Sequence, residues 1–292
     1  HPCEVAKYLR SELSVYFLHI GQREVFEHIL AGLDTALWDL ALRSAGQSFA
    51  EHMHIAPSVK SYASSLNRDD FTEKLQTHGG FGQKHFKLKL GFDENEDCMF
   101  VAEAAERCPT DTRLMVDSNQ KWDADQAIRM LKRLEPCELL FAEEAIPANA
   151  GLSEWERLAT ASPTPLAAGE NVYGVDNFLS LANAGVRYLQ PDEAKWGGAS
   201  GALDLAKRGP PGVYLWPHFM GTAVGQMAAF SVSGAIGDES SCEMDVNTNP
   251  LRSQLCGDVL AITDGRVGLP TEPGLVVPPD PASLSLFTDK HA

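Results

Sequence analysis

Apolar stretches and amphipathic stretches alternate along the chain from residue 57 onward. Short apolar or β-branched runs, typical of buried strands, occupy residues 58–65, 85–90, 113–116, 139–142, 165–168, 186–189 and 213–216. Between them lie segments of helical periodicity at residues 95–107, 123–134, 152–161, 175–184, 200–207 and 222–236. Repeated strand–helix alternation predicts parallel strands joined by right-handed crossovers. We therefore expect an α/β fold built on a (β/α)8 barrel, which typically takes about 250 residues.

The start of the chain does not follow this alternation. Residues 25–42 carry apolar side chains at helical spacing, namely Ile29, Leu33, Leu37 and Leu40, with Trp38 beside them. This pattern predicts a buried helix outside the barrel. The chain opens without a methionine, which indicates that it starts within a longer sequence.

The end of the chain is also irregular. Beyond the barrel the sequence is rich in Gly and Pro, and its β-prone runs at residues 260–263 and 275–277 are short. We expect a non-helical segment that packs back toward the start of the chain. These patterns divide the chain into residues 1–56, a barrel at 57–257 and a C-terminal segment at 258–292.

Composition and charge narrow the classes of partner. Of the 292 residues, 44% are hydrophobic and 22% are charged, which is ordinary for a globular protein. The net charge of −16 argues against nucleic acids and anionic membranes, because those surfaces are themselves negative. The six cysteines form no C-x-x-C pair, the first residues do not have the basic-then-apolar pattern of a secretory leader, and no apolar run reaches about 18 residues. We therefore expect a cytoplasmic protein with reduced thiols.

From residue 85 onward an ionisable residue occurs at or just after the end of each predicted strand, and one more follows at the same spacing. In chain order these residues are Lys89 (with Lys87 in K-L-K), Asp117, Glu143, Glu170, Asp192, His218 and Glu243. Successive members are about 22 to 28 residues apart, which corresponds to one strand, one helix and two loops. The carboxyl ends of barrel strands converge on the face that carries the active site in such barrels. We expect these side chains to lie together there.

Three of these side chains have the chemistry of a metal site. Asp117, Glu143 and Glu170 supply hard oxygen ligands from successive strands, which suits Mg²⁺ rather than zinc. Zinc sites favour His and Cys, which do not occur at these three positions. The sequence therefore predicts a Mg²⁺ site at the barrel mouth.

The remaining strand-end residues predict two bases on opposite sides of this metal. Lys89 would be the base on one side and His218 the base on the other. Asp192 would accept a hydrogen bond from the imidazole of His218, fix its tautomer and raise its basicity. This arrangement suits removal of the proton next to a carboxylate, because a metal stabilises the charge of the enediolate that forms.

The motifs around these residues resemble those of the enolase superfamily, and within it the mandelate racemase subgroup. In family order they are the K-x-K strand, the D-x-N turn, E-E, G-E-N, the D-x-x-K-x-G-G loop, a His at a strand end and a late Glu. The segment L-D-T-A-L-W-D-L at residues 33–40 is similar to the helix before the family's barrel. The resemblance implies a modified barrel in which residues 1–56 are the helical remnant of an N-terminal α+β capping domain.

Carried over residue by residue, the resemblance assigns the first half of the site. Lys89 resembles the base on one face of the α carbon. Lys87 resembles a neighbour that tunes this base and contacts the substrate carboxylate. Asp117, Glu143 and Glu170 resemble the ligands of Mg²⁺.

The second half of the site follows in the same way. His218 paired with Asp192 resembles the second acid/base, and Glu243 resembles the group that hydrogen-bonds a carboxylate oxygen. Asn119 is a candidate for substrate binding, although an Asx turn is an equally good interpretation. Asp192 precedes Gly197 by five residues, where the muconate-lactonizing type has a lysine, and this favours the mandelate racemase type.

Two departures from the family pattern stand out. The strands of the capping domain, whose mobile loops cover the barrel mouth in the family, have no counterpart in residues 1–50. The family motif E-E-P is replaced by Glu143-Glu144-Ala145. Lys195 stays outside the predicted catalytic set, because it has an equally good interpretation as an ion-pair partner of a neighbouring carboxylate.

Three hypotheses of function follow from the sequence. The first is a lyase that dehydrates an acid sugar, which is favoured because the subgroup contains many acid-sugar dehydratases. The second is a racemase or 2-epimerase of a hydroxy acid, which would use the same residues. The third is a truncated or inactive barrel protein. In either enzymatic case we expect a small carboxylate substrate and a homo-oligomer, as is common in the family.

Overall fold

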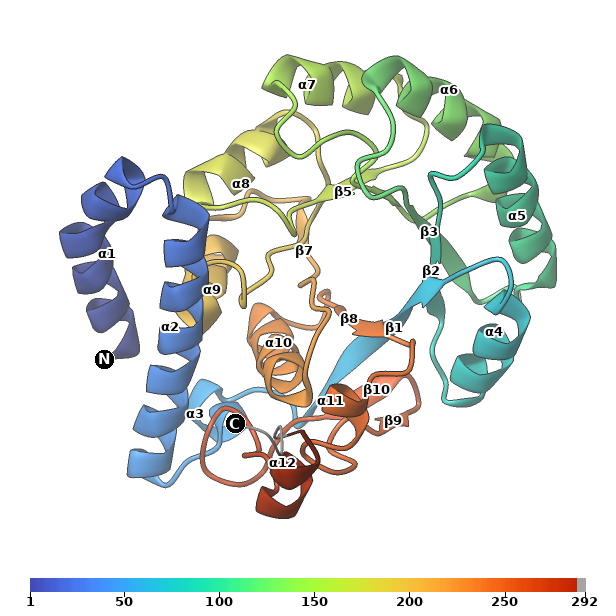
Figure 1. The fold of residues 1–292 in the computed structure, drawn as a ribbon. Helices are drawn as coiled ribbons and strands as arrows, with labels where there is room; N and C mark the ends of the chain where they lie inside the picture. Colours follow the sequence, from blue (N-terminus) through green and yellow to red (C-terminus); the bar gives the residue numbers. More distant parts are fainter. Residues whose placement is uncertain (288–292) are drawn as a thin grey trace.

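A ring of parallel strands forms the centre of the molecule in the computed structural model, which describes residues 1–287 (Figure 1). The strands of the ring are β1 (Ser58–Leu66), β2 (His85–Lys89), β3 (Arg113–Asp117), β4 (Ala142–Glu143), β5 (Leu166–Ala168), β6 (Tyr188–Leu189), β7 (Tyr214–Leu215) and β8 (Cys242–Asp245). Within the described residues, β8 pairs with β1, and parallel pairing continues in order from β1 to β7. A backbone hydrogen bond of 3.2 Å from Glu243 N to Pro217 O joins β8 to the segment after β7. The predicted (β/α)8 barrel is confirmed.

Helices follow the strands of the ring and surround it (Figure 1). They are α4 (Phe71–Gly80), α5 (Glu94–Arg107), α6 (Ala124–Leu134), α7 (Leu152–Ala161), α8 (Val175–Asn183), α9 (Gly198–Arg208) and α10 (Ala223–Ile236), with a short 3₁₀ helix at Glu135–Cys137. Local sequence explains where they begin. Asp123 caps α6 by accepting from Gln126 N at 2.7 Å, and Thr222 caps α10 in the same way. The helix α4 was not among the predicted segments.

Two apolar layers hold the barrel together. The larger layer fills the space between strands and helices, where Leu88 and Val116 of the strands meet Leu131 and Leu158 of the helices, each at most 1% exposed. The smaller layer lies inside the ring and is built on aromatic side chains, among them Tyr62, Phe141, Tyr188 and Trp216. This aromatic layer fills the barrel interior. The polar side chains at the carboxyl ends of the strands therefore lie on one face of the barrel.

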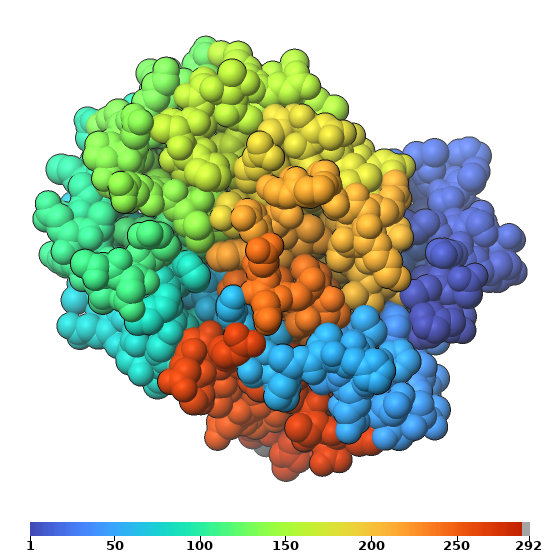
Figure 2. All heavy atoms as spheres, turned by 180° about the vertical axis from the view of Figure 1, so that it is seen from behind, coloured from blue at the N-terminus to red at the C-terminus, as the bar shows by residue number. Residues whose placement is uncertain are grey.

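Three helices precede the barrel and lie outside it. They are α1 (Pro2–His19), α2 (Arg23–Ala45) and α3 (Phe49–Met53), and the dark blue N-terminal part stands out at one side of the molecule in Figure 2. The helix predicted at residues 25–42 is present, but its predicted buried face is wrong. Ile29, Leu33 and Leu40 are 55%, 38% and 61% exposed, and Trp38 is buried as expected. Leu30, which the prediction did not include, is buried as well. The helix carries apolar residues on two faces, and the face that packs on α1 and α9 is the one we did not select.

The C-terminal segment returns to both the barrel and α2. β10 (Arg266–Gly268) pairs antiparallel with β1 and with β9 (Ile262–Thr263), while α11 (Pro250–Ser253) lies just before them. The expectation of a wholly non-helical tail is wrong, because α12 (Pro281–Phe287) is helical. Its first turn is organised by a carboxylate, since Asp280 accepts from Ser283 N and Ala282 N, each at 3.3 Å.

The division of the chain at residues 56 and 257 stays a prediction, and residues 288–292 of the last segment lie outside the described residues. Among residues 1–287 there is no helix of the length and apolar character needed to cross a membrane. The expected cytoplasmic location likewise stays a prediction.

Candidate active site

The strand register places the first predicted site residues side by side. Lys89 at the end of β2 is level with Asp117 at the end of β3, and Asp117 is level with Glu143 at the end of β4. Because Lys87 is two residues before Lys89, both lysines point to the same side of β2. Aligned strand ends therefore bring two ammonium groups and two carboxylates into one small volume.

Lys87 lies at the bottom of this cluster with no exposure to solvent. Its Nζ is 2.6 Å from Glu143 Oε2 and 2.7 Å from Glu243 Oε1, and it lies 5.5 Å from the centroid of the Tyr62 ring. Burial alone would lower the pKa of Lys87, but the two carboxylates outweigh it and the pKa is raised well above its ordinary value. Lys87 is therefore a permanent cation that joins β2, β4 and β8.

The pKa values of Glu143 and Glu243 shift in opposite directions beside this shared cation. Burial, together with nearby carboxylates such as Asp117, raises the pKa of Glu143 to about 8. Burial also opposes ionisation of Glu243, but Lys87 and His218 overcome it and lower the pKa of Glu243 to about 2. The shared cation thus favours the charged form of both carboxyls, but it outweighs burial only at Glu243.

Lys89 is the more accessible of the two lysines. Its Nζ donates to Asp117 Oδ2 at 2.5 Å and to Asn119 Oδ1 at 3.1 Å. Asp117 also accepts from Asn119 N at 2.8 Å, which is an Asx turn that holds Asn119 at a φ of 45°. Asn119 is thus a turn residue whose side chain also orients the predicted base.

His218 and Asp192 form the pair that the sequence predicts. The Nδ1 of His218 is 2.8 Å from Asp192 Oδ2, and its Nε2 is 2.8 Å from Glu170 Oε2. Burial would lower the pKa of His218, but Glu243, Asp192 and Glu170 together raise it well above its ordinary value. Because Asp192 accepts at Nδ1, the nitrogen that faces the barrel mouth is Nε2.

Glu170 is in turn surrounded by hydrogen-bond donors. Asn171 Nδ2 donates to Glu170 Oε1 at 2.7 Å, and Lys195 Nζ lies 3.6 Å from the same oxygen. Burial opposes ionisation, but the hydrogen bond from His218 and the nearby cations keep the pKa of Glu170 far below its ordinary value. Lys195, which we left outside the catalytic set, therefore reaches the site as a neighbour of Glu170.

The three predicted metal ligands surround the same buried space, but each is paired with a cation of the protein. Asp117 contacts Lys89, Glu143 contacts Lys87, and Glu170 contacts His218. In these positions no group of three His, Cys, Asp or Glu side chains among residues 1–287 has the geometry of a metal site. Their chemistry nevertheless fits Mg²⁺. Burial and, after it, the nearby carboxylates of Asp117 and Glu170 raise the pKa of Glu143, and a divalent cation would offset both effects.

Comparison with known proteins decides the family. The model of the enolase C-terminal domain-like family matches residues 68–283, which is most of the barrel and the tail. The chain belongs to this family. The resemblance to the enolase superfamily, mandelate racemase type, predicted from the motifs is thereby confirmed.

Similar proteins include sugar-acid enzymes and solved barrels. D-galactarolactone cycloisomerase of Agrobacterium fabrum is 30% identical over 91% of this chain and 75% of its own length. Arabinonate dehydratase of Saccharolobus solfataricus is 26% identical over 93% of this chain and 75% of its own length. A mandelate racemase/muconate lactonizing enzyme from Bordetella bronchiseptica superposes with a TM-score of 0.92 and 36% identity, covering 99% of this chain and 81% of that one. This chain is therefore an enzyme of the enolase superfamily.

One solved member of the fold carries the expected metal. The structure of a racemase from Streptomyces coelicolor with bound magnesium has a TM-score of 0.83 and 24% identity, covering 97% of this chain and 81% of that one.

Two residues of this enolase-superfamily site were missed by the sequence reasoning. Gln190 Nε2 donates to Glu143 Oε2 at 2.5 Å from the end of β6, where the side chain is 1% exposed. Tyr62 of β1 lies under Lys87. Gln190 could have been found, because it precedes Asp192 by two residues and so points to the same side of the chain. The sequence pattern did not indicate Tyr62, because a tyrosine in a predicted buried strand is typical of the apolar core.

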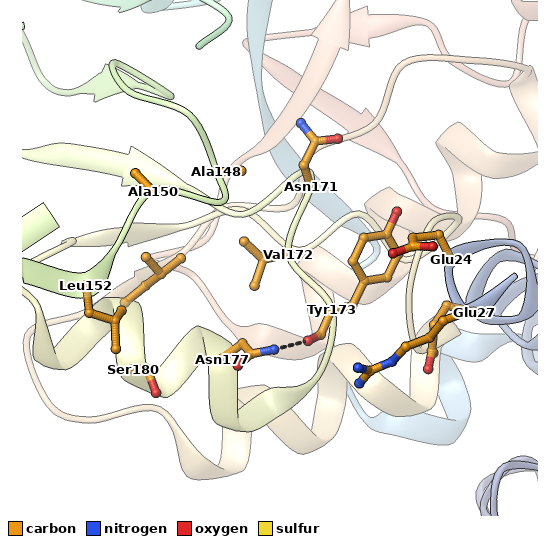
Figure 3. Close-up of a pocket in the computed structure, with 12 residues that line it drawn as sticks. Glu24, Glu27, Ala148, Ala150, Leu152, Asn171, Val172, Tyr173, Asn177 and Ser180 are labelled. Atoms are coloured by element: carbon orange, nitrogen blue, oxygen red, sulfur yellow. Dashed lines mark hydrogen bonds between the residues drawn. The ribbon is translucent and has the colours of Figure 1, made fainter. Parts of the chain in front are cut away.

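A cavity of about 350 Å³ adjoins the site (Figure 3). Glu24 and Glu27 line it from α2, and Asn171 and Tyr173 line it from the loop after β5. Asn171 is the link to the site, because its amide donates to Glu170 and, at 3.0 Å, to Glu144. Burial raises the pKa of Glu144 to about 7, so this carboxyl supports Asn171 rather than acting as a strong anion.

Proposed function

We propose that this enzyme is Mg²⁺-dependent and removes the proton α to the carboxylate of an acid sugar, forming an enediolate that loses the β-hydroxyl as water. The observation that carries the proposal is that the side chain of each predicted base contacts the side chain of a predicted metal ligand. Lys89 contacts Asp117 at 2.5 Å, and the Nε2 of His218 contacts Glu170 at 2.8 Å. The names of the relatives, an arabinonate dehydratase and a D-galactarolactone cycloisomerase, support the substrate class.

Asp117, Glu143 and Glu170 would hold the metal. Bound there, Mg²⁺ would supply Lewis-acid stabilisation of the charge that develops on the substrate carboxylate. Lys87 adds a fixed positive charge at the base of the same space, with an Nζ that no solvent reaches. Such a preorganised cation in a dry site stabilises a developing anion without any reorganisation of water.

The two bases differ in how their protons are controlled. Burial and the ammonium of Lys87 lower the pKa of Lys89, while Asp117 raises it, with a net rise in the present arrangement. His218 keeps its Nδ1 on Asp192 and therefore exchanges protons at Nε2. One base would take the α proton and the other would protonate the departing hydroxyl, which leaves as water. The enol that remains becomes the ketone by gaining a proton at the β carbon and losing its hydroxyl proton. The first base then releases its proton to solvent and the second takes one up, which restores both starting states.

The test is a library of sugar acids incubated with the enzyme and Mg²⁺. We expect one or more acids to give a ketone that semicarbazide traps. In D₂O this product should carry deuterium at the former β carbon, because the α carbon becomes the carbonyl carbon. Lys89→Ala and His218→Asn should each lose on the order of 10²- to 10⁴-fold in rate, as for removal of a general acid or base. Lys84→Ala is the matched control, because Lys84 pairs with Asp111 on the exposed surface.

The outcomes separate the hypotheses. Deuterium incorporation without ketone would replace the dehydratase by the racemase or epimerase, which uses the same two bases. If a folded protein that binds Mg²⁺ gives neither ketone nor deuterium incorporation with any acid, the hypothesis of an inactive barrel is supported.

A further inference from the structure

Asp34 is a buried carboxylate on a helix that precedes the barrel strands. It lies in the middle of α2, outside the barrel, and is 1% exposed. Its Oδ2 accepts from Ser200 N at 2.9 Å, and its Oδ1 has no hydrogen-bond partner within residues 1–287. The apolar pattern of residues 25–42 places Asp34 in a helix but gives it no role.

The partner of Asp34 is the start of α9. Gly197 precedes this helix and has no side chain to cap it, so the carboxylate that reaches its first turn comes from α2. A carboxylate at this position satisfies a free N–H group and interacts favourably with the helix dipole. A second link runs beside it, because Trp38 Nε1 donates to Ser200 Oγ at 2.9 Å. Two side chains of α2 thus hold one turn of α9.

Gly198 shows how closely the two helices approach. A Cβ on Gly198 would lie 2.5 Å from Asp34 Oδ2 and 2.6 Å from Asp34 Cβ, and its φ of 58° is itself unfavourable for other residues. The first residue of α9 therefore has to be glycine for Asp34 to reach Ser200 N.

The start of α9 is joined to the acid/base pair by a short, tightly bonded loop. Asp192 opens this loop, and its Oδ1 accepts from Ala194 N at 2.9 Å and from Lys195 N at 3.1 Å. The backbone carbonyl of Asp192 accepts from Trp196 N at 2.9 Å, and the Trp196 side chain is buried. With so few free torsions between Asp192 and Gly198, a shift at the start of α9 is passed on to Asp192.

We propose that Asp34 is a positioning residue for the acid/base pair: by holding the first turn of α9 it fixes the loop that carries Asp192 and so aligns His218. The catalytic role of His218 in this proposal rests on the proposed function. The predicted effect of Asp34 on the position of His218 does not rest on it. Because Asp34 belongs to α2, the position of the reacting Nε2 of His218 would depend on a helix outside the barrel.

The first experiment compares the Asp34→Ala and Asp34→Asn variants with the wild-type protein. The substrate is the acid that exchanges its α proton in the library. We expect Asp34→Ala to lower kcat on the order of ten- to a hundred-fold with little change in KM, as for a small misplacement of a reacting group. Asp34→Asn keeps an oxygen acceptor for Ser200 N and should restore most of the rate.

A matched control lies on the same helix. Asp39 accepts from Leu275 N at 2.9 Å and from Arg43, so Asp39→Asn weakens the contact of α2 with the C-terminal segment instead of α9. We expect Asp39→Asn to lower the Tm but to leave kcat unchanged. A lower Tm for Asp34→Ala with a wild-type kcat would overturn the proposal and make Asp34 a structural cap.

The second readout needs neither substrate nor metal. In the wild-type protein the Nδ1 proton of His218 should give a downfield NMR resonance, because it is hydrogen-bonded to Asp192, and His218→Asn assigns it. We expect Asp34→Ala to shift or broaden this resonance and Asp39→Asn to leave it in place. An unchanged resonance in Asp34→Ala overturns the proposal. Absence of exchange with every sugar acid would overturn the proposed function alone, since the resonance still reports the alignment.

A double-mutant cycle tests the direct contact. Gly198→Ala should lower kcat and broaden the resonance in the wild-type background, because its Cβ would meet Asp34. In the Asp34→Ala background the same change should have a smaller effect, because the close contacts with the carboxylate are gone. The contact with the Cβ of residue 34, at 2.6 Å, and the backbone strain at Gly198 remain. Equal effects in the two backgrounds would contradict the contact and with it the proposal.

Discussion

Removal of Lys87 is the perturbation whose effect on stability the structure defines most clearly. In Lys87→Met the ammonium that lies 2.6 Å from Glu143 and 2.7 Å from Glu243 is lost from a fully buried position. Glu143 can take up a proton, because burial already raises its pKa to about 8. Glu243 has the lower pKa, about 2, and is left as an uncompensated charge or must be neutralised at a cost.

The expected loss follows from two general quantities. Removing one partner of a buried ion pair destabilises a protein by about 3–5 kcal/mol. An unfolding entropy of about 2.1 cal/mol/K per residue over 292 residues corresponds to about 0.6 kcal/mol/K. The Tm of Lys87→Met should therefore fall by about 5–8 °C, measured by calorimetry at pH 7 with EDTA.

Two further variants make this prediction specific. Lys84→Met removes a lysine from the same strand region, but its pair with Asp111 is exposed, with side chains 52% and 62% accessible. An exposed pair contributes about 0–1 kcal/mol, so this control should shift the Tm by less than about 2 °C. Adding Glu243→Gln to Lys87→Met should recover part of the loss. A fall in Tm no larger than that of Lys84→Met would refute the reasoning.

Two further predictions concern pH and metal. Burial and Asp192 raise the pKa of Glu193 well above 4.5, so its contribution to stability is complete below about pH 4.5 and is lost as the pH rises. Glu193→Gln should therefore gain Tm over the wild type as the pH is raised from 4.5 to 8, and a Tm difference that does not vary with pH would contradict this. Because Glu143 has a pKa of about 8, Mg²⁺ binding at pH 7 should release protons and tighten as the pH approaches 8. Calorimetric titration in two buffers of different ionisation enthalpy measures this release, and identical binding heats in both would rule it out.

The sequence was sufficient for the barrel and for the strand-end residues because both follow from local periodicity. A strand that ends in Asp117 or Glu143 has its phase set by its own alternation, and parallel pairing then brings the ends together. The same logic would have found Gln190, which shares the phase of Asp192. It could not find Asp34, whose partner Ser200 is 166 residues away on another helix.

The errors arose where two apolar faces competed. Ile29 and Leu30 are neighbours on α2, and the pattern alone does not say which side meets α9. The face that α2 buries depends on its contacts with α1. The helix α1 was not predicted, because apolar residues are spread around it, and Tyr8 and Val15 are exposed at 62% and 58%. Local pattern therefore predicts the elements, while the face that each helix buries depends on its neighbours in space.

The most direct test of the proposed metal site is a crystal structure with Mn²⁺ in place of Mg²⁺, read by anomalous scattering. We predict one strong anomalous peak bounded by oxygens of Asp117, Glu143 and Glu170, with the Nζ of Lys89 and the Nε2 of His218 moved off those carboxylates and facing the space above the ion. A map from well-ordered crystals at saturating Mn²⁺ that shows no peak there, with both ion pairs still in place, would contradict the proposed function.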